Sequence, residues 1–540
     1  MDARSKELPT DVATLQSLLL EKMAKLEQSQ SVIAERDAEI CKKNTLVSEQ
    51  QRRIAVLEEY LRLQKQKRFG RSSEQTSGQL EIFNEAEFEV EFAPEDDADI
   101  KIPQESPNRK KKPGRKPIAK DLPRVRIELS LTDEDKAGAS STFFALAREE
   151  VDIIPAQVRV LQYWQEKAVF TDADGKKRIQ CADLPPHILP KTRVSPGFLA
   201  HVATAKFCDG LPLYRQTKIL QRHRLEMARA GLAKQMIGVG TAVMPILNLL
   251  RDHQLSGPLI NADETPIQVL KEKGRPPDSE SQMWVQVGGT EQRRAVLFNY
   301  FPSHAQTVPK ALFAGYRGYL QTDGHPSYNA VVKLEGIVHV GCWDHARRKF
   351  IEAIMAVPKK LRKANPDTIA NTALGYINTL YRIERRIKDL QPDDRFQHRQ
   401  VLSVPVMNEL RTWLDEVFPI VAKDGLTGKA LIYLNNQWSK LVRYVDHGIL
   451  PISNGRAENA IRPFVIGRNA WLFADTPAGA HASAALYSLV ETAKANHLEP
   501  YHYLKHVFTE IPKAASVEDF ERLLPWNVPE SAVPRLKPVS

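Results

Sequence analysis

Cysteine is scarce in this 540-residue sequence, and its four occurrences are isolated: Cys41, Cys181, Cys208 and Cys342. They have neither the paired spacing of a zinc site nor the density of a disulfide framework. The N-terminus lacks the apolar segment of a secretory signal, and the longest apolar stretch, around residues 242–250, is far shorter than a membrane span. We therefore expect a protein of a reducing, cytoplasmic compartment that is neither exported nor inserted into a membrane.

The charge balance is moderately basic. The chain has 76 Lys and Arg against 66 Asp and Glu, a net charge of +10, and 42% hydrophobic residues. This composition is that of a soluble protein, and the length requires several domains. A basic balance is compatible with a polyanionic partner such as DNA, but many proteins that bind no nucleic acid are equally basic.

An apolar residue recurs at every seventh position of residues 1–66, from Val12 to Leu61. This repeat predicts one long amphipathic helix. The companion positions three residues further on are mostly polar, as at Lys22 and Arg36. Two interpretations stay open: a coiled coil through which the chain self-associates, or a helix that packs its single stripe on another part of the chain. Both give this segment a role in assembly.

Residues 67–119 are predicted to form a flexible linker, acidic at first and then basic. The basic part, NRKKKPGRKP, contains Lys112, Arg115 and Lys116 around a Pro-Gly pair. Such a segment is similar to hooks that lie in the minor groove of A·T-rich DNA. A solvated linker that touches phosphates without sequence preference explains the same residues.

Residues 120–195 are predicted to form a small β-rich module, because VRIELSL and QVRVLQYWQEKAVF alternate with a period of two. Residues 196–255 are predicted to be helical. Within them, LYRQTKILQRHR and ARAGLAKQMIGVG flank a break near Leu225 and have the outline of a helix-turn-helix. Helix pairs are common in any helical region, so DNA binding here is one hypothesis and ordinary packing is the other.

Two short apolar runs each lead to an aspartate. LINADETP (259–266) carries Asp263, and GYLQTDG (318–324) carries Asp323 before a glycine turn. Most aspartates in such places are solvated turn formers. The predicted element order, however, is strand, hairpin, helix, strand, helix, strand, which is the order of a ribonuclease-H-like fold. That fold places the first strand beside the fourth and brings Asp263 and Asp323 together at neighbouring strand ends.

The remaining segments complete a predicted α/β catalytic core. Its first part covers 256–356, a helical insertion covers 357–450, the core resumes over 451–498, and a helical tail covers 499–540. In the resumed part, Asn454-Gly455 can begin a helix that has Glu458 in its first turn. The helix dipole alone would favour a glutamate there. The arginines and the tryptophan that follow make the segment too cationic and aromatic for a simple cap.

Asp263, Asp323 and Glu458 at one place would repel one another unless cations lay among them. Carboxylate oxygens select magnesium or manganese over zinc. Two such ions can activate water or a DNA 3′-hydroxyl for an in-line phosphoryl transfer. We therefore expect Asp263 to bridge two divalent cations, Asp323 to bind one of them and Glu458 the other. Neighbouring Glu264 is expected to face the other side of the strand in a structural role.

Basic and aromatic residues near these carboxylates are candidates for DNA contact. We expect phosphates to be bound by residues of WDHARRKF and by arginines around Glu458, namely Arg347, Arg348, Lys349, Arg456, Arg462 and Arg468. Trp343 and Trp471 could stack on an unpaired base. A buried core position is the more common role for each tryptophan.

These segments resemble, in order, those of the transposases of the insertion sequence 66 family, a branch of the DDE transposases with a ribonuclease-H-like core. The matching segments are KRFGRSSE, PGRKP, KFCDGLPLYRQ, INADETPIQVL, LQTDGHPSYNAV, HVGCWDHARRKF, NGRAENAIRPFVIGRNAWLF and ETAKANHLEPYHYL. The resemblance implies that Asp263, Asp323 and Glu458 are the catalytic triad. It also implies cleavage at the ends of a mobile element, joining of those ends to target DNA, accessory proteins of the same element, and a nucleoid-associated, bacterial setting.

The sequence departs from the family pattern at three places. The cysteine-rich zinc module that usually follows the basic linker has no cysteine here, so zinc is not expected. GRNAWLF stands where the family has GRKNWLF, and Asp344 stands where a small residue is common. A DNA-binding or assembly protein that has lost the chemistry is therefore the alternative function. A paired-carboxylate hydrolase of sugars is a weaker one, because the arginine clusters favour phosphate.

Overall fold

The structure is a computed structural model. It describes residues 177–536 apart from 357–367, 420 and 422, together with parts of 11–43 and 124–171. The chain separates into two compact units, 1–85 and 86–540. In the first unit the described positions between Thr14 and Lys43 are helical, including Leu19 and Leu26 of the predicted stripe. The linker 67–119 lies outside the described residues, and so do Lys112, Arg115 and Lys116.

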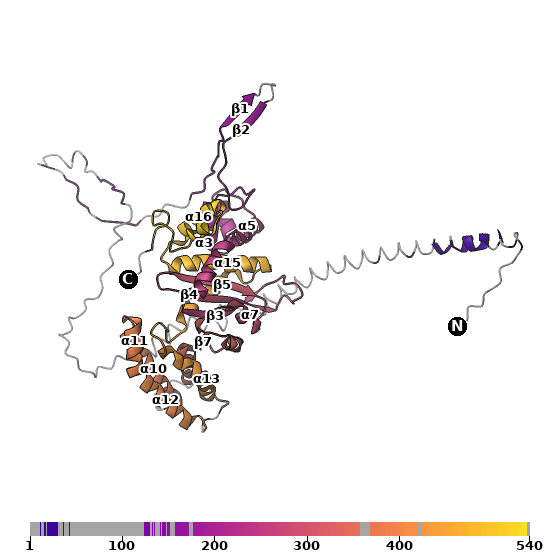
Figure 1. Ribbon diagram of the computed structural model, residues 1–540. Helices are drawn as coiled ribbons and strands as arrows, with labels where there is room; N and C mark the ends of the chain where they lie inside the picture. Colours follow the sequence, from indigo (N-terminus) through magenta and orange to yellow (C-terminus); the bar gives the residue numbers. More distant parts are fainter. Residues whose placement is uncertain are drawn as a thin grey trace. The chain divides into compact units, whose positions relative to one another are not determined.

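A five-stranded mixed sheet organises the second unit (Figure 1). The strands are β3 (Leu259–Gln268), β4 (Glu280–Gly289), β5 (Arg294–Phe301), β6 (Gly318–Gln321) and β7 (Ile337–Val340). Their order across the sheet is β5-β4-β3-β6-β7. Strand β4 is antiparallel to both β5 and β3, whereas β6 is parallel to β3 and β7 is parallel to β6. The first strand thus lies beside the fourth, as the sequence predicts.

The elements between these strands follow the predicted order. Strands β4 and β5 form the hairpin, α7 (Thr307–Leu312) precedes β6, and a 3₁₀ helix, η1 (Pro326–Lys333), precedes β7. One detail of the prediction is wrong: β3 does not end near Asp263 but continues through Pro266 to Gln268. Beyond Asn261 the strand pairs with β4 alone, and a proline is tolerated in a strand that has a free edge.

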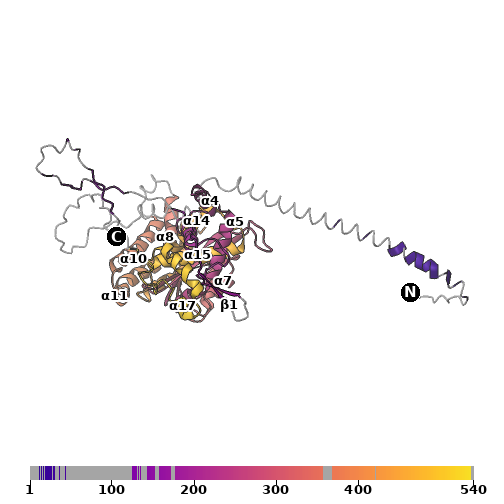
Figure 2. The ribbon, with the colours of Figure 1, turned by 90° about the horizontal axis from the view of Figure 1, so that it is seen from above.

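Helices cover both faces of the sheet, and each face has its own core. One core joins odd-numbered strand residues such as Val285 and Val287 to the helices α3 (Pro196–Phe207), α5 (Arg229–Ala242), α6 (Met244–Leu255), α14 (Gly455–Trp471), α15 (Pro477–Ala495) and α16 (Pro500–Glu510). The other joins even-numbered residues such as Ile260 and Trp284 to α7 and η1. Helices α14 and α15, both labelled in Figure 2, meet in this core, where the rings of Phe464 and Tyr487 have centres 5.2 Å apart. Because side chains alternate along a strand, consecutive residues of β3 face different helices.

The outer edge of β5 is covered by polar side chains of α15 at helical spacing. Asn496 exchanges hydrogen bonds with the backbone of Arg294, and Thr492 does the same with Val296. Ser488 accepts a hydrogen bond from the backbone N–H of Phe298 at 2.8 Å. An exposed edge strand would present unpaired backbone groups to other chains. The ETAKANHLEP segment therefore closes this edge.

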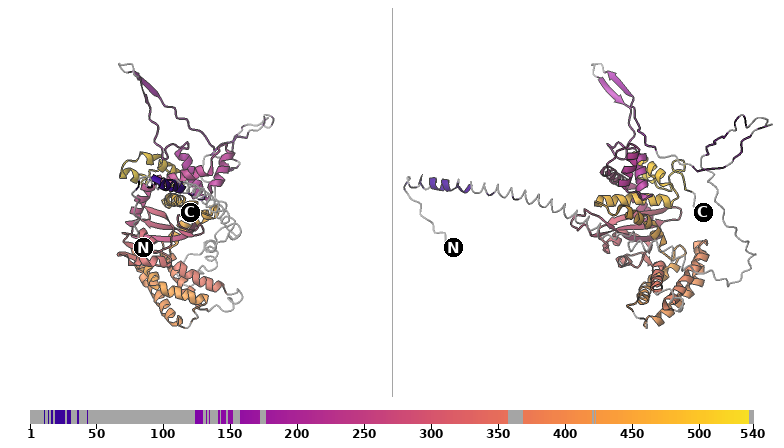
Figure 3. Two further views of the ribbon diagram at one scale, coloured as in Figure 1. Left: turned by 90° about the vertical axis from the view of Figure 1, so that its right-hand side faces the viewer. Right: turned by 180° about the vertical axis from the view of Figure 1, so that it is seen from behind.

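Helices of the segment predicted as an insertion pack beside α8 (Trp343–Met355). They are α10 (Ile369–Ile387), α11 (Pro392–His398), the π-helix η2 (Arg399–Ser403), α12 (Val404–Val417), α13 (Leu426–Leu441) and the 3₁₀ helix η3 (Val442–Val445). Figure 3 shows these helices in orange. The helical character predicted for the segment is confirmed for the described residues.

Arg399 ties this helical segment to the chain that leads to α14. Its guanidinium is fully buried and donates to both carboxylate oxygens of Glu384 and to the carbonyls of Tyr444, His447 and Leu450. Five donors thus meet five acceptors, which satisfies a cation that would otherwise be costly to bury.

The β-rich prediction for residues 120–195 is largely wrong for the described residues. They contain one hairpin, β1 (Lys167–Thr171) and β2 (Lys177–Cys181), while 124–129 and 157–166 form no strand. Alternate residues of VRIELSL are exposed, with Val125 at 86%. Period-two alternation stabilises a strand where one face packs on a core, and this segment packs on none within the described residues.

The helical prediction for 196–255 agrees with the structure, and in the described part of 499–540 the helices extend as far as Glu521. Besides the core helices, they include α4 (Leu213–Arg222), the 3₁₀ helix η4 (Ile511–Lys513) and α17 (Val517–Glu521). Among the described residues no single helix is long and apolar enough to cross a membrane. Helices α5 and α6 pass that test of length and composition only when taken together, and they are bent by 48° at their junction.

Candidate functional site

A buried amide network joins the ends of β3 and β6 to the start of α14. Asn261 on β3 donates to Gln321 Oε1 on β6 at 2.8 Å and to Asn454 Oδ1 at 3.2 Å. Asn454, the residue before α14, donates in turn to the carbonyl of Ala262 at 2.8 Å. All three amides are buried, with Asn454 fully so. Segments almost 200 residues apart are thereby linked through hydrogen bonds that water does not weaken.

Three carboxylates, which we call the carboxylate site, surround this network. Asn261 and Gln321 form the last pair between β3 and β6, so Asp263 and Asp323 both lie two residues beyond the same pair. Glu458 is in the first turn of α14, and its side chain is 14% exposed. The register therefore brings Asp263, in the middle of β3, and Asp323, just after β6, to the same level of the sheet.

Asp263 is partly buried among other acidic groups. Burial raises the pKa of Asp263 well above its usual value, and the charges of Glu264, Glu458 and Asp323 raise it further. One hydrogen bond, from the backbone N–H of Glu264 to Asp263 Oδ1 at 2.9 Å, opposes this rise. A carboxylate in such a place either takes up a proton or associates with a cation. The all-oxygen donor set fits a hard divalent cation.

The three carboxylates do not form the tightest ligand groups of the described residues. Two groups have all their ligand atoms within 4.8 Å of one another: Glu264 with His304 and His325, and Cys342 with His345 and Glu458. Neither group contains Asp263 or Asp323. Of the predicted ligands only Glu458 belongs to such a group, in which it has two neighbours that sequence reasoning missed.

Those neighbours come from the start of α8. Cys342 Sγ lies 3.7 Å from Glu458 Oε1, and His345 Nδ1 lies 3.6 Å from the same oxygen. Burial raises the pKa of the Cys342 thiol well above its usual value, so the sulfur carries a proton at neutral pH. Burial, and then the charge of Arg348, lowers the pKa of His345. Glu458 is thus bordered by a neutral thiol and a neutral imidazole.

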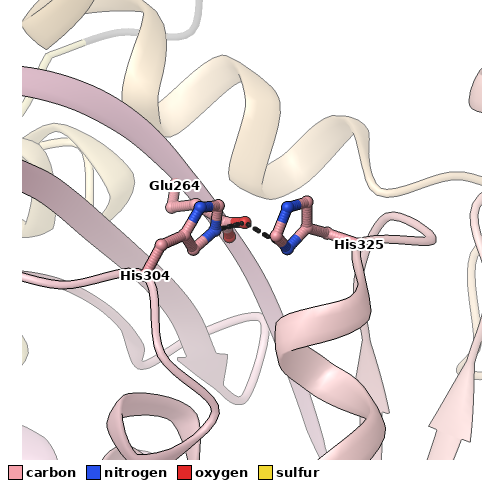
Figure 4. A group of neighbouring side chains, drawn as sticks. All are labelled: Glu264, His304 and His325. Atoms are coloured by element: carbon pink, nitrogen blue, oxygen red, sulfur yellow. Dashed lines mark hydrogen bonds and ion pairs between the residues drawn. The ribbon is translucent and has the colours of Figure 1, made fainter. Parts of the chain in front are cut away.

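The second group lies around Glu264 (Figure 4). His304 Nε2 donates to Glu264 Oε1 at 2.8 Å, and the hydroxyl of Tyr328 donates to Glu264 Oε2. The ring of His325 stacks on that of His304 at 4.0 Å with an interplanar angle of 5°. Glu264 is therefore on the strand face opposite to the α14 side, as alternation predicts, and it has a defined hydrogen-bonding role. The histidines gave no recognisable signal in the sequence.

The basic residues predicted to bind DNA have different surroundings. Arg348 points to the carboxylate site, with its guanidinium 3.8 Å from Glu458 Oε2. Arg347 donates to Asn378 Oδ1 at 3.2 Å, and the ammonium of Lys349 lies 5.0 Å from the centre of the Tyr433 ring. These two contact the insertion helices, so Arg348 is the residue of WDHARRKF best placed to meet a phosphate at the carboxylates.

The arginines of α14 are also distributed along its length. Arg468 donates to the hydroxyl of Thr265 at 3.0 Å and to the carbonyl of Pro266, which joins α14 to the end of β3. Arg456 lies 3.9 Å from Glu291 in the turn between β4 and β5. Arg462 is partly buried. DNA contact by these three residues stays a prediction.

Asp344, the negative charge beside the basic segment, has a partner within the protein. The hydroxyl of Tyr381 on α10 donates to Asp344 Oδ1. Burial raises the pKa of Tyr381 well above its usual value, and the charge of Asp344 raises it further. Asp344 therefore connects α8 to α10, and its charge is engaged there.

The two tryptophans differ in burial. Of the two roles considered for Trp343, the buried core position agrees with the structure and base stacking does not, because the indole is fully buried and donates to the carbonyl of Leu441 at 3.0 Å. Trp471 is partly buried, with its ring edge-on to Phe464 and the ammonium of Lys206 5.0 Å from its centre. Base stacking by Trp471 stays a prediction.

The predicted helix pair is formed by α4 and α5, with the break at 223–228. Leu232 and Met236 of α5 are buried in the main core, and a Cβ at Gly240 would lie 2.8 Å from the Cα of Ala482 on α15. One face of α5 is thus used for packing on α15. DNA contact by the remaining surface stays a prediction.

Comparisons with known proteins agree on one family. A model described as "Transposase IS66 family" matches residues 191–482, more than half of the chain, and "IS66 C-terminal element" matches 488–526. A third model, "Transposase C of IS166 homeodomain", matches 56–127. Two relatives from Sinorhizobium fredii (strain NBRC 101917 / NGR234) carry the names "Uncharacterized protein y4qI" and "Uncharacterized protein y4hP". The first is 27% identical over 98% of this chain and 99% of its own length, and the second 26% identical over 88% of each.

Proposed function

Because the chain belongs to the IS66 family of transposases, we propose that it cleaves DNA at the ends of its insertion sequence and joins those ends to target DNA. The observation that carries the proposal is the β3–β6 register, in which Asp263 and Asp323 both lie two residues beyond the last shared pair, with Glu458 in the first turn of α14. Clustered carboxylates with a partly exposed arginine beside them are suited to phosphodiester chemistry and have no use in a purely structural helix cap.

The strand order supports assignment of the core to the ribonuclease-H-like class. Three antiparallel strands are followed by two that are parallel to the first, and the first lies beside the fourth. Helices connect the later strands of the sheet. After the helical segment, α14 contacts the last part of β3 through Arg468. The domain boundaries expected from the sequence stay predictions.

Asp263, Asp323 and Glu458 would hold two divalent cations, magnesium or manganese, because their donor atoms are all carboxylate oxygens. Such a pair activates the attacking oxygen and stabilises the leaving oxygen of a phosphodiester. The charges of both other carboxylates raise the pKa of Asp263, as expected for a ligand that two ions share. Arg348 faces Glu458 and would bind a nonbridging phosphate oxygen. The amide network keeps β3, β6 and α14 in register.

A cleavage assay tests this proposal. The substrate is a supercoiled plasmid that carries the gene with the DNA that flanks it in its genome, so that the element's ends and neighbouring reading frames are included. Nicked and linear products are measured with magnesium, with manganese or with EDTA. Asp263→Asn, Asp323→Asn and Glu458→Gln each remove one negative charge with little change in shape, and each is expected to reduce cleavage to the level of the EDTA sample.

Asp393→Asn is the matched control, because Asp393 is an exposed carboxylate in the first turn of α11. It should cleave like the unaltered chain. If the three site variants also cleave at that rate, the assigned carboxylates are wrong. A footprint on the element's ends without cleavage in either metal would instead favour a DNA-binding assembly protein that has lost the chemistry.

We further propose that the first 66 residues mediate self-association and that accessory proteins of the same element act with the chain at the nucleoid. Leu19 and Leu26 are helical and 63% and 60% exposed, so the stripe is available to a second helix. Light scattering of the full chain should give an oligomer that Leu19→Lys with Leu26→Lys converts to a monomer. An oligomer that survives this change would place the interface elsewhere.

A further inference from the structure

The histidine pair beside Asp323 has no assigned role. One ligand atom each of His304, His325 and Glu264 lie within 4.8 Å of one another. Two imidazoles and a carboxylate are a donor set that could suit a transition metal. The ring geometry argues against one. The lone pair of an imidazole nitrogen lies in the ring plane, and the two rings are nearly parallel, at 5°, with their centres 4.0 Å apart. Lone pairs in parallel stacked planes do not converge on one ion.

The surroundings of His325 determine where its ring hydrogen lies. His325 Nδ1 accepts a hydrogen bond from the backbone N–H of Ser327 at 3.2 Å and lies 2.9 Å from the Ser327 hydroxyl. A nitrogen that accepts from a backbone N–H cannot carry a hydrogen itself, so the hydrogen is on Nε2. Among the described residues Nε2 has no hydrogen-bond partner, and the side chain is 38% exposed.

The ring of His325 is kept in place by His304. His304 donates to Glu264 Oε1, and this hydrogen bond raises the pKa of His304. Trp284 contacts the His304 ring edge-on, with ring centres 5.4 Å apart. A ring that is fixed by Glu264 and Trp284 thus provides a rigid surface on which His325 stacks, and a donor on a fixed ring needs no reorganisation when it meets a ligand.

His325 is also fixed relative to Asp323. Its backbone N–H donates to Asp323 Oδ1 at 3.0 Å. A phosphodiester bound at Asp323 would therefore lie beside the residue whose backbone N–H holds this carboxylate. Because Nδ1 and Nε2 lie on opposite sides of an imidazole, the Nε2–H points away from Ser327 and its helix.

We propose that His325 is a catalytic residue whose Nε2–H donates a hydrogen bond to a nonbridging oxygen of the scissile phosphodiester bound at Asp323. The inference rests on the proposed function and adds a residue to it. The donor is preorganised by its contacts, and its hydrogen bond strengthens as negative charge develops on the phosphoryl oxygens. His304, Glu264 and Tyr328 act as positioning residues for the ring.

His325→Asn separates this role from a purely structural one. An asparagine oxygen accepts the Ser327 N–H as the histidine nitrogen does, so the start of η1 stays capped. The variant loses the Nε2–H and the stacked ring. Single-turnover cleavage of the flanking-DNA plasmid is expected to fall roughly 100-fold, while DNA affinity, Mn²⁺ affinity by calorimetry and the thermal unfolding midpoint are unchanged. His325→Gln, whose amide reaches toward the Nε2 position, should recover part of the rate.

His447→Asn is the matched control. His447 Nδ1 accepts from the N–H of Ile449 at 3.1 Å in the same local arrangement, and the side chain is exposed. It should cleave at the unaltered rate. Full-rate cleavage by His325→Asn would show that His325 only caps η1, and the inference would be wrong. A loss of Mn²⁺ affinity in this variant would show that His325 is a metal ligand, which would also contradict the inference. Failure of the unaltered chain to cleave at all would refute the proposed function and this inference with it.

Discussion

Replacement of Asn454 should uncouple α14 from the sheet. The residue is fully buried, donates to the carbonyl of Ala262 and accepts from Asn261. Asn454→Ala removes the side-chain donor to the Ala262 carbonyl. It also removes one of the two acceptors of the Asn261 amide, which keeps its hydrogen bond to Gln321. An unsatisfied buried polar group costs about 1–3 kcal/mol, so we expect a loss of about 2–4 kcal/mol in the free energy of unfolding.

Asn454→Asp should destabilise the protein at least as much, although it keeps the shape. It replaces the donating amide with an oxygen that faces the Ala262 carbonyl, and it adds a charge near Asp263 and Glu458. Thermal unfolding measures the stability of both variants, and a Mn²⁺ titration measures whether Glu458 keeps its place. Both should lower Mn²⁺ affinity, because α14 is no longer connected to β3 through this amide.

Asn469→Ala is the control, since Asn469 is exposed on the same helix, and it should change stability by less than about 0.5 kcal/mol. If Asn454→Ala unfolds at the same midpoint as Asn469→Ala and binds Mn²⁺ equally well, the buried amide network does not position α14.

Three further predictions concern the scaffold. Arg399→Met should lower the free energy of unfolding by about 3–5 kcal/mol, because it leaves the Glu384 carboxylate and three carbonyls without their hydrogen-bond donor. Chemical denaturation would measure this loss. Thr492→Val should cost about 1–3 kcal/mol and increase aggregation on heating, since it opens the edge of β5; light scattering during a thermal ramp would detect this. Burial lowers the pKa of Lys206 to about 8, below its unfolded value, so the unfolded chain binds more protons between that pKa and the unfolded one. Stability should therefore rise as pH increases from about 8 toward 10, and Lys206→Met should abolish that slope in unfolding midpoints measured across the range.

Local sequence pattern was sufficient to predict most elements of residues 256–498. The strands that carry or precede Asp263 and Asp323, the hairpin between them and the helix that holds Glu458 can each be predicted from a few neighbouring residues, although the end of β3 was placed too early. Element order then placed the first strand beside the fourth. Pattern failed for VRIELSL, because alternation states which residues share a face and not whether anything covers that face.

Side-chain environments were decided by tertiary structure. Trp343 became a core residue and Asp344 a partner of Tyr381 only because α10 and α13 pack on α8. His304 precedes α7 and β6 in the sequence and His325 follows them, so the spacing of the two histidines along the chain does not predict that their rings stack. The sequence by itself thus determined most strands and helices of residues 196–521, since these depend on neighbours along the chain, and it singled out three candidate carboxylates. Only the tertiary structure decided which groups surround those carboxylates, because burial, charge and hydrogen bonding there come from segments up to about 200 residues apart.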